Sequence, residues 1–302
     1  MSEKDQLFRF VFENTHIRGE IVHLDASFQS AVQYHQYPQP IRILLGQAMA
    51  ATALLGATIK YEGMLSLQLQ GKGPVKLLIV QLSSEDTIRG MVEWDTDYHA
   101  VLGAEGEWTL PQLVTDGYMA ITVESKTQGD RYQGIVDLAA DNLAAALENY
   151  FDQSEQLNTR LWLSASNNSA AGLLLQLMPG TEESGLQEEQ EDWSRLNYLS
   201  GTITEQELQG LPVREILHRL YSEEDVRLFE PDSIRFVCTC SRQRIENMLK
   251  GLGYQEVREI FEQEQMVSVE CEFCKQAYKF DAVDIEKLFA GGITPQVPRT
   301  RH

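Results

Sequence analysis

Patterns typical of helices and of strands alternate along the first 180 residues, and one short segment alternates strictly between hydrophobic and polar side chains. Leu65, Leu67 and Leu69 alternate with polar residues, and the sequence GKGP at 71–74 separates them from a second apolar segment at 75–82. Alternation with a period of two is typical of a strand that buries one face, so these segments predict a hairpin. Similar patterns predict further strands at 87–94, 118–125, 131–138, 159–165 and 172–178.

Longer segments have the period of a helix. Residues 25–36, 38–60 and 141–153 predict three helices, the second of which opens with prolines that a first helical turn tolerates. The stretch from Ile43 to Ile59 carries no charge, but it falls just short of the ~20 residues that a membrane span needs and is rich in Ala, Gly and Thr. We interpret it as a buried helix. Residues 1–180 therefore predict one α/β (α+β) domain with mixed or antiparallel sheets.

The composition changes after Pro179. The segment TEESGLQEEQED at 181–192 contains acidic residues and no basic ones, which is typical of a linker. Apolar residues then return at helical spacing, and the clearest stripe consists of Val213, Ile216, Leu217, Leu220 and Tyr221. Residues 181–230 therefore predict an acidic, amphipathic helical linker. We expect its stripe to pack against an apolar face of the first domain.

Residues 231–302 predict a third, smaller region. The segment DSIRFVCTC reads as a strand, and SRQRIENMLKG reads as a helix that Ser241 caps and Gly251 ends. A short helix at 255–263 precedes VSVECEFCKQAYKF, which we interpret as a hairpin. Asp281 is placed to cap a last helix.

Charge and missing motifs exclude several functions. With 45 acidic and 25 basic residues the net charge is −20, which opposes nucleic-acid binding and favours solubility. The N-terminus has no apolar run typical of a signal peptide, so we expect a cytoplasmic protein with no membrane partner. GKGP lacks the spacing and the hydroxyl of a P-loop, and neither HExxH nor GxSxG occurs. We therefore expect neither ATP use nor enzymatic activity.

All four cysteines lie in the third region, as the pairs Cys238/Cys240 and Cys271/Cys274. Inert buried thiols would not need this pairing, and permanent disulfides are disfavoured in a reducing compartment. The third interpretation, one zinc ion per chain held by all four thiolates, is favoured. In a strand, residues i and i+2 point to the same side, and CxxC at a hairpin turn offers two more sulfurs.

Four thiolates would close the coordination sphere and leave no position for a substrate, which opposes a metalloenzyme. A zinc-ribbon adaptor with a purely structural ion remains the alternative. The region is too small to supply a large core, so loss of the metal should unfold it. Thiolates are also the form that oxidants attack, and each pair is close enough in sequence to become a local disulfide. The site could therefore act as a switch.

The chain resembles the 33 kDa chaperonin family, the redox-regulated heat-shock holdases of bacteria. The resemblance covers nearly the whole chain. It rests on CTC at 238–240 and CEFC at 271–274 behind an acidic helical linker. It rests also on FEN at 12–14, RGE at 18–20, YPQP at 37–40, LQLQGKGP at 67–74, DRYQGIV at 130–136 and SEQLNTRL at 154–161.

This resemblance implies an ATP-independent chaperone that is inactive when reduced and zinc-bound. Carried over to the matching positions, oxidation would join Cys238 to Cys240 and Cys271 to Cys274 and release zinc. The C-terminal region would then unfold and destabilise the linker, and the active form, a homodimer, would hold unfolding client proteins. The stripe at Val213, Ile216, Leu217, Leu220 and Tyr221 is the candidate client or linker surface.

Overall fold

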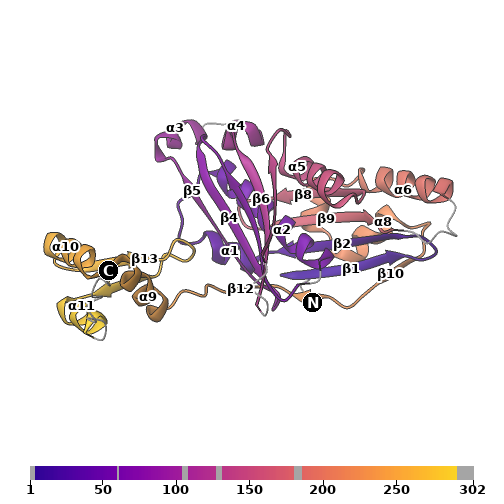
Figure 1. Cartoon of the computed structure of the whole chain (residues 1–302). Helices are drawn as coiled ribbons and strands as arrows, with labels where there is room; N and C mark the ends of the chain where they lie inside the picture. Colours follow the sequence, from indigo (N-terminus) through magenta and orange to yellow (C-terminus); the bar gives the residue numbers. More distant parts are fainter. Residues whose placement is uncertain (1–3, 60, 104–107, 127–130, 180–185, 291–302) are drawn as a thin grey trace, which may run out of the picture. The chain divides into compact units, whose positions relative to one another are not determined.

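The structure is a computed structural model that describes residues 4–59, 61–103, 108–126, 131–179 and 186–290. Asp130 of the segment DRYQGIV, residues 181–185 of the predicted linker and the last residues of the third region, 291–302, lie outside this description. The chain divides into two compact units, Met1–Val237 and Cys238–His302 (Figure 1).

One six-stranded sheet of unit 1, sheet B, has the strand order β12-β5-β4-β3-β6-β7. The predicted hairpin is confirmed: β3 (Gly63–Gln70) and β4 (Val75–Ser83) flank the GKGP turn and pair antiparallel, with Leu67 opposite Val80. The remaining strands are β5 (Thr87–Trp94), β6 (Tyr118–Ser125), β7 (Arg131–Asp137) and the short β12 (Arg235–Phe236), which pairs with β5 in parallel.

The second six-stranded sheet, sheet A, has the order β10-β1-β2-β9-β8. Its long strands are β1 (Gln6–Phe12), β2 (Ile17–Leu24), β8 (Thr159–Ala165) and β9 (Ala170–Leu177). Two short strands, β10 (Val226–Leu228) and β11 (Asp232–Ser233), pair with the other side of β1. Gly19 of β2 leaves room for the Phe10 ring, because a Cβ at this position would approach that ring to 2.2 Å.

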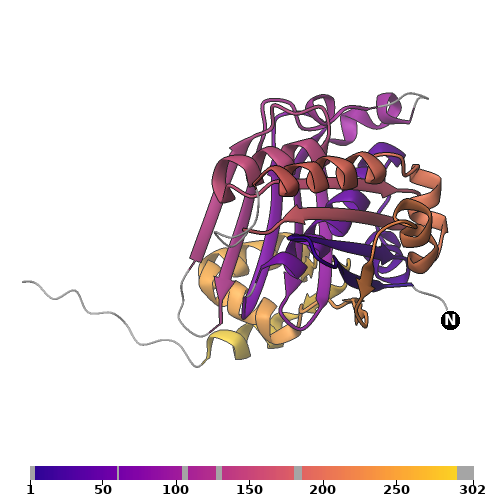
Figure 2. The ribbon, with the colours of Figure 1, turned by 90° about the vertical axis from the view of Figure 1, so that its right-hand side faces the viewer.

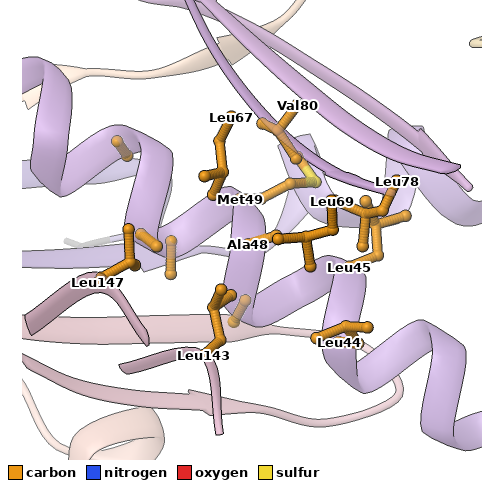
Figure 3. Packing of buried hydrophobic residues seen from close by; sticks show 14 of the residues in the cluster. Leu44, Leu45, Ala48, Met49, Leu67, Leu69, Leu78, Val80, Leu143 and Leu147 are labelled. Atoms are coloured by element: carbon orange, nitrogen blue, oxygen red, sulfur yellow. The ribbon is translucent and has the colours of Figure 1, made fainter. Parts of the chain in front are cut away.

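Helix α2 (Gln39–Thr58) packs against strands of both sheets and forms the centre of the main core. Its side chains Leu45 and Met49 meet Leu69 and Val80 of sheet B (Figure 3). By length and composition this helix would qualify as a membrane span, but 67% of its most apolar window is buried inside the protein. The prediction of a buried helix is confirmed. Shorter helices accompany it: α1 (Ala26–Val32), α3 (His99–Leu102), α4 (Leu110–Val114) and α5 (Leu143–Tyr150).

Three helices cover the face of sheet A that points away from α2 (Figure 2). They are α6 (Leu186–Ser200), α7 (Glu205–Gly210) and α8 (Val213–Leu220). A capping box starts α7, where the Thr204 and Glu207 side chains each accept the other residue's backbone amide. The described part of the predicted linker is therefore folded and packed.

The described residues of unit 2 form a two-stranded sheet and three helices. A hairpin of β13 (Val267–Glu270) and β14 (Ala277–Phe280) lies with α9 (Arg242–Leu252), α10 (Tyr254–Glu264) and α11 (Ala282–Phe289). The side chains of Ser241 and Asp281 cap α9 and α11 as predicted, whereas α9 continues past Gly251 to Leu252. The mixed helix and sheet class is confirmed. The predicted strand at 232–240 is wrong for residues 237–240, which form no strand.

Candidate metal and redox centre

The first cysteine pair lies in the loop that leads into α9. Ser241 ends this loop by accepting a hydrogen bond from the Arg244 amide at 3.3 Å. The Arg244 guanidinium then reaches back and donates to the carbonyl of Thr239, the residue between the two cysteines, at 2.8 Å. Cys238 and Cys240 are therefore placed by the start of a helix and not by strand pairing.

The second pair lies in the tight turn between β13 and β14. The Cys271 amide donates to the Gln276 carbonyl at 3.0 Å, and the Lys275 amide donates to the Cys271 carbonyl at 2.8 Å. Lys275 adopts φ 55°, a left-handed conformation that reverses the chain directly after Cys274. Its ammonium group is 2.8 Å from the Glu272 carboxylate. This turn is the knuckle that the CxxC spacing predicts.

The two loops bring the four sulfur atoms together. The Sγ atoms of Cys238 and Cys271 are 3.6 Å apart, those of Cys240 and Cys274 are 3.4 Å apart, and all four lie within 4.8 Å of one another. In a tetrahedral zinc site with bonds of ~2.3 Å, neighbouring sulfurs are ~3.8 Å apart. All four residues are free, half-buried thiols. The donor set fits one zinc ion.

Tyr278 extends the site beyond its four cysteines. Its hydroxyl donates to Cys240 Sγ at 3.2 Å. Burial raises the pKa of Cys238 and Cys274. At Cys240 burial acts in the same direction, but hydrogen bonds, first that from Tyr278, outweigh it and lower the pKa. The bond to Cys240 raises the pKa of Tyr278 to about 12, so the hydroxyl keeps its proton at neutral pH.

The core of unit 2 is small. Among its described residues five apolar side chains are fully buried: Leu249, Val257, Val267, Phe280 and Ile285. Burial of one such side chain contributes ~1.5–3 kcal/mol, which conformational entropy largely offsets in a domain of this size. Coordination by the four cysteines would add a link between the loop before α9 and the β13–β14 turn.

The predicted stripe lies in unit 1, against sheet A. Val213, Ile216 and Tyr221 are at most 2% exposed, and Leu217 and Leu220 at most 9%. They pack on apolar residues of the outer face of the sheet, including Phe8, Phe10, Phe12, Ile21 and Leu173. The Tyr221 ring meets Phe12 edge to face at 4.8 Å, and its hydroxyl bonds the buried Ser200 hydroxyl at 2.6 Å.

Two residues of the metal site were missed by sequence reasoning. Arg244 orders the first cysteine loop, and Tyr278 contacts Cys240 across 38 positions of the chain. A weak signal for Tyr278 existed, because it follows Cys274 by four residues and lies on the returning strand of the hairpin. Arg244 carried none, since a basic residue in the first turn of a helix normally faces solvent.

Comparisons with known proteins agree with this architecture. The sequence is 44% identical to the 33 kDa chaperonin of Nitrosococcus oceani over 302 residues, with all of both chains covered. It is 44% identical to that of Shewanella denitrificans, with 99% of both chains covered. A solved structure, the 33 kDa chaperonin (heat shock protein 33 homolog) of Thermotoga maritima, matches 95% of this chain and 98% of its own with a TM-score of 0.78. At 21% identity that likeness shows the fold alone.

The family comparison covers nearly the whole chain. Residues 5–281 match the family described as Hsp33 protein, a range that includes the long strands of both large sheets, the linker helices and all four cysteines. The family match and the names of these relatives support a chaperone, as the resemblance of the sequence motifs implied. The chain belongs to the Hsp33 family.

Proposed function

We propose that this protein is a redox-regulated, ATP-independent holdase, which binds unfolding proteins under oxidative stress and prevents their aggregation. The observation that carries the proposal is the convergence of Cys238, Cys240, Cys271 and Cys274, the only cysteines of the chain, on one point of a small unit. A metal centre that closes its coordination sphere performs no catalysis. It does make the folding of its unit depend on the redox state of its ligands.

In the reduced protein the four thiolates would hold one zinc ion, and this coordination would link the loop before α9 to the β13–β14 turn and stabilise the fold of unit 2. Oxidation by a peroxide removes two electrons for each disulfide. One thiolate attacks the peroxide and becomes a sulfenic acid, and the second displaces its oxygen as water. Pairing Cys238 with Cys240 and Cys271 with Cys274 consumes two peroxides and the complete ligand set, so that the ion is no longer held.

The surface proposed for clients is hidden in the structure. The stripe covers the outer face of sheet A, on which Phe8, Phe10 and Phe12 of β1 lie. We call this surface the aromatic face of sheet A. Unfolding of unit 2 would loosen the linker and expose both surfaces, which together form an apolar patch of the kind that a holdase needs. The net charge of −20 would keep the client complex in solution.

The proposed functional parts are the core domain 1–180, the linker 181–230 and the switch region 231–302. We extend the proposal to a homodimeric active form and a cytoplasmic location. The proposed function requires no ATP, no nucleic-acid or membrane partner and no catalytic activity. This agrees with the lack of a P-loop, HExxH or GxSxG motif and with the net charge of −20. The family match supports binding of client proteins.

An aggregation assay on the reduced and the oxidised protein tests the function. Light scattering of a chemically denatured protein should be suppressed by the peroxide-treated form and not by the reduced, zinc-loaded form. Reduction of the treated protein in the presence of zinc should reverse the effect. Equal and negligible suppression by both forms would favour an adaptor with a structural zinc site instead.

Metal analysis tests the ligand set. The Cys271→Ser variant should retain clearly less zinc than the parent, because serine replaces one of four thiolates. Ser268→Ala, on an exposed position of the neighbouring strand, is the control and should retain one zinc per chain. Full retention of zinc by Cys271→Ser would contradict the four-thiolate assignment.

A further inference from the structure

The segment that joins α8 to the first cysteine runs along the edges of both large sheets. We call this segment, residues 225–237, the strap. Its strands β10 and β11 pair with β1, and its strand β12 pairs with β5 (Figure 1). Among the described strands, and apart from the strap, β1 is the last on its side of sheet A and β5 the last on its side of sheet B. The strap therefore occupies one edge of each sheet.

Backbone hydrogen bonds hold the strap in place. Strap amides donate to carbonyl oxygens of both edges: Phe229 to Arg9 and Ile234 to Asp5 at 2.9 Å, Arg235 to Asp86 at 3.0 Å, and Val237 to Ile88 at 3.2 Å. In return the Glu13 amide donates to the Asp225 carbonyl at 2.8 Å. Bonds of this kind depend on an extended backbone and not on the identity of the side chains.

Side chains add a preference for alternating apolar residues. Ile234 is 3% exposed and belongs to the core between the two sheets, on which Phe236 also packs. Together with Asp232, Ile234 forms part of the wall of a cavity of about 530 Å³. At the other end of the strap, Val226 and Leu228 pack beside the aromatic face of sheet A. The edges thus accept an extended chain that is apolar at every second residue.

The strap is weakly held compared with the other strands. Strands β11 and β12 have only two residues each. An ion pair between Arg9 and Asp232 fastens β11, but both side chains are 41% exposed, and such pairs contribute little. The strap also continues directly into Cys238, so unfolding of unit 2 would leave its C-terminal end unanchored.

We propose that the strap occupies, in the inactive protein, the sites at which β1 and β5 bind extended segments of unfolding proteins by strand addition. This inference rests on the proposed holdase function and assigns it a mode of binding. Unfolding proteins differ in sequence but share an exposed backbone, and alternating apolar residues are common in their strand-forming segments. An unpaired sheet edge recognises both features, whereas a rigid apolar pocket would select particular side chains.

A peptide with the strap sequence, DVRLFEPDSIRFV, is the probe. Its binding is measured by fluorescence anisotropy to the reduced parent, the oxidised parent and two reduced variants. Ile234→Asp removes the buried anchor of the strap, while Ser233→Asp places the same charge on the exposed residue directly before it and is the control. A second peptide carries N-methyl groups at Phe229, Ile234 and Arg235, which removes three donors and keeps every side chain.

The oxidised parent and the reduced Ile234→Asp variant should bind the strap peptide at least tenfold more tightly than the reduced parent and Ser233→Asp. The methylated peptide should bind at least tenfold more weakly, and excess unmodified peptide should displace a denatured client. Equal binding of both peptides, or no binding to an oxidised protein that does suppress aggregation, would overturn the inference. A peptide that separates dimers but leaves clients bound would assign the edges to a second copy and also overturn it.

Different results would refute the proposed holdase function and the strand-addition inference. An oxidised protein that does not suppress aggregation would refute the holdase proposal. Selective binding of the strap peptide to reduced Ile234→Asp would, in that case, still show that the two edges accept added strands. Zinc content and far-UV circular dichroism of both variants confirm that each is folded before binding is compared.

Discussion

The hydroxyl of Tyr278 donates a hydrogen bond to a sulfur of the candidate metal site. A donor of this kind delocalises the negative charge of a thiolate and holds the ligand in place. Removal of such an outer-shell partner typically lowers metal affinity by ~10–100-fold. We therefore expect Tyr278→Phe to bind zinc about tenfold more weakly than the parent, as measured by competition with a chromogenic chelator.

Tyr254→Phe is the matched control for that measurement. Tyr254 is another hydroxyl of unit 2, but it bonds the Glu286 carboxylate at 2.9 Å instead of a cysteine. Its loss should leave the zinc affinity unchanged. Parent-like affinity in Tyr278→Phe would show that the hydroxyl merely lies near the sulfur without supporting it.

Glu20 is a buried carboxylate on the face of sheet A that points toward α2. It is 1% exposed, and Arg18 Nε lies 3.7 Å from one of its oxygens. Burial raises the pKa of Glu20 to about 7, because it outweighs the attraction of the carboxylate to the charges of Arg18 and Arg9. The folded state therefore keeps a proton that the unfolded chain loses above pH ~4.3. This contribution to stability is complete below that pH and is lost as the pH rises through about 7.

The Glu20→Gln variant should respond less to pH than the parent. Between pH 5 and 8 the parent should lose about 3 kcal/mol of unfolding free energy that the variant keeps. All four tryptophans lie in unit 1, so urea unfolding followed by tryptophan fluorescence reports this unit. Glu93→Gln, at an exposed position of β5, is the control and should follow the parent. Parallel profiles for Glu20→Gln and the parent would refute the assignment.

At the scale of elements, α8 joins the switch to the surface that it hides. Five side chains of this helix and its C-terminal neighbour are buried on sheet A, and burial contributes ~1.5–3 kcal/mol for each. Ile216→Asp with Leu217→Asp places two charges in that interface and should release the helix. We expect the reduced, zinc-loaded double variant to suppress client aggregation without oxidation.

The control for this variant uses the exposed face of the same helix. Arg214→Asp with His218→Asp introduces two aspartates without disturbing the buried face, and should stay inactive until it is oxidised. If Ile216→Asp with Leu217→Asp also remained inactive until oxidised, the stripe would be ordinary core, and clients would bind elsewhere.

The accuracy of the predicted elements followed the strength of their local signals. The β3–β4 hairpin was predicted because each of its strands buries alternate residues, and the glycines of its turn tolerate sharp reversal. Strand β1 was not predicted, because both of its faces are largely apolar and Arg9 interrupts the alternation. Residues 237–240 were assigned to a strand on β-propensity, but their positions depend on the sulfurs and on Arg244, which are tertiary contacts.

The candidate site, too, could be predicted only where local sequence patterns indicate it. The spacing of the cysteines indicated four ligands, because CxC and CxxC each present two sulfurs within a few residues. The contact of Tyr278 with Cys240 could not be predicted, because it depends on the fold of the β13–β14 hairpin beside the first loop. Residues 225–230 of the strap were predicted as part of the helical linker and residues 231–237 as part of the cysteine region, since nothing local shows that residues 226–236 pair with β1 and β5.

At the scale of the whole molecule, the two units differ greatly in the cores that they bury. Unit 2 has a few buried apolar side chains, whereas unit 1 surrounds α2 with apolar residues of two sheets. Removal of zinc by a chelator, or oxidation, should therefore expose the chain to protease after Pro231 first, and then back through the linker to Thr181, which lies outside the described residues. Residues 4–178 should be cut last.

Limited proteolysis with mass spectrometry of the fragments checks this order. The reduced, zinc-loaded protein at the same protease concentration is the reference, and it should be cut slowly throughout the described part of unit 1. Early cleavage within residues 4–178 after zinc removal would place the redox-sensitive element in unit 1 instead.

The position of α2 determines which part of the molecule has to refold after stress. Since this helix supplies core residues to both sheets, neither sheet can separate from it without exposing the other, and unit 1 should unfold in a single cooperative step. The described core around α2 consists of residues of unit 1, to which the strap adds Ile234 and Phe236. Unit 2 and the strap can therefore unfold and refold many times while the rest of unit 1 stays folded. Recovery after stress would then require only the refolding of a short C-terminal segment, a local event that is fast compared with the formation of two long-range sheets.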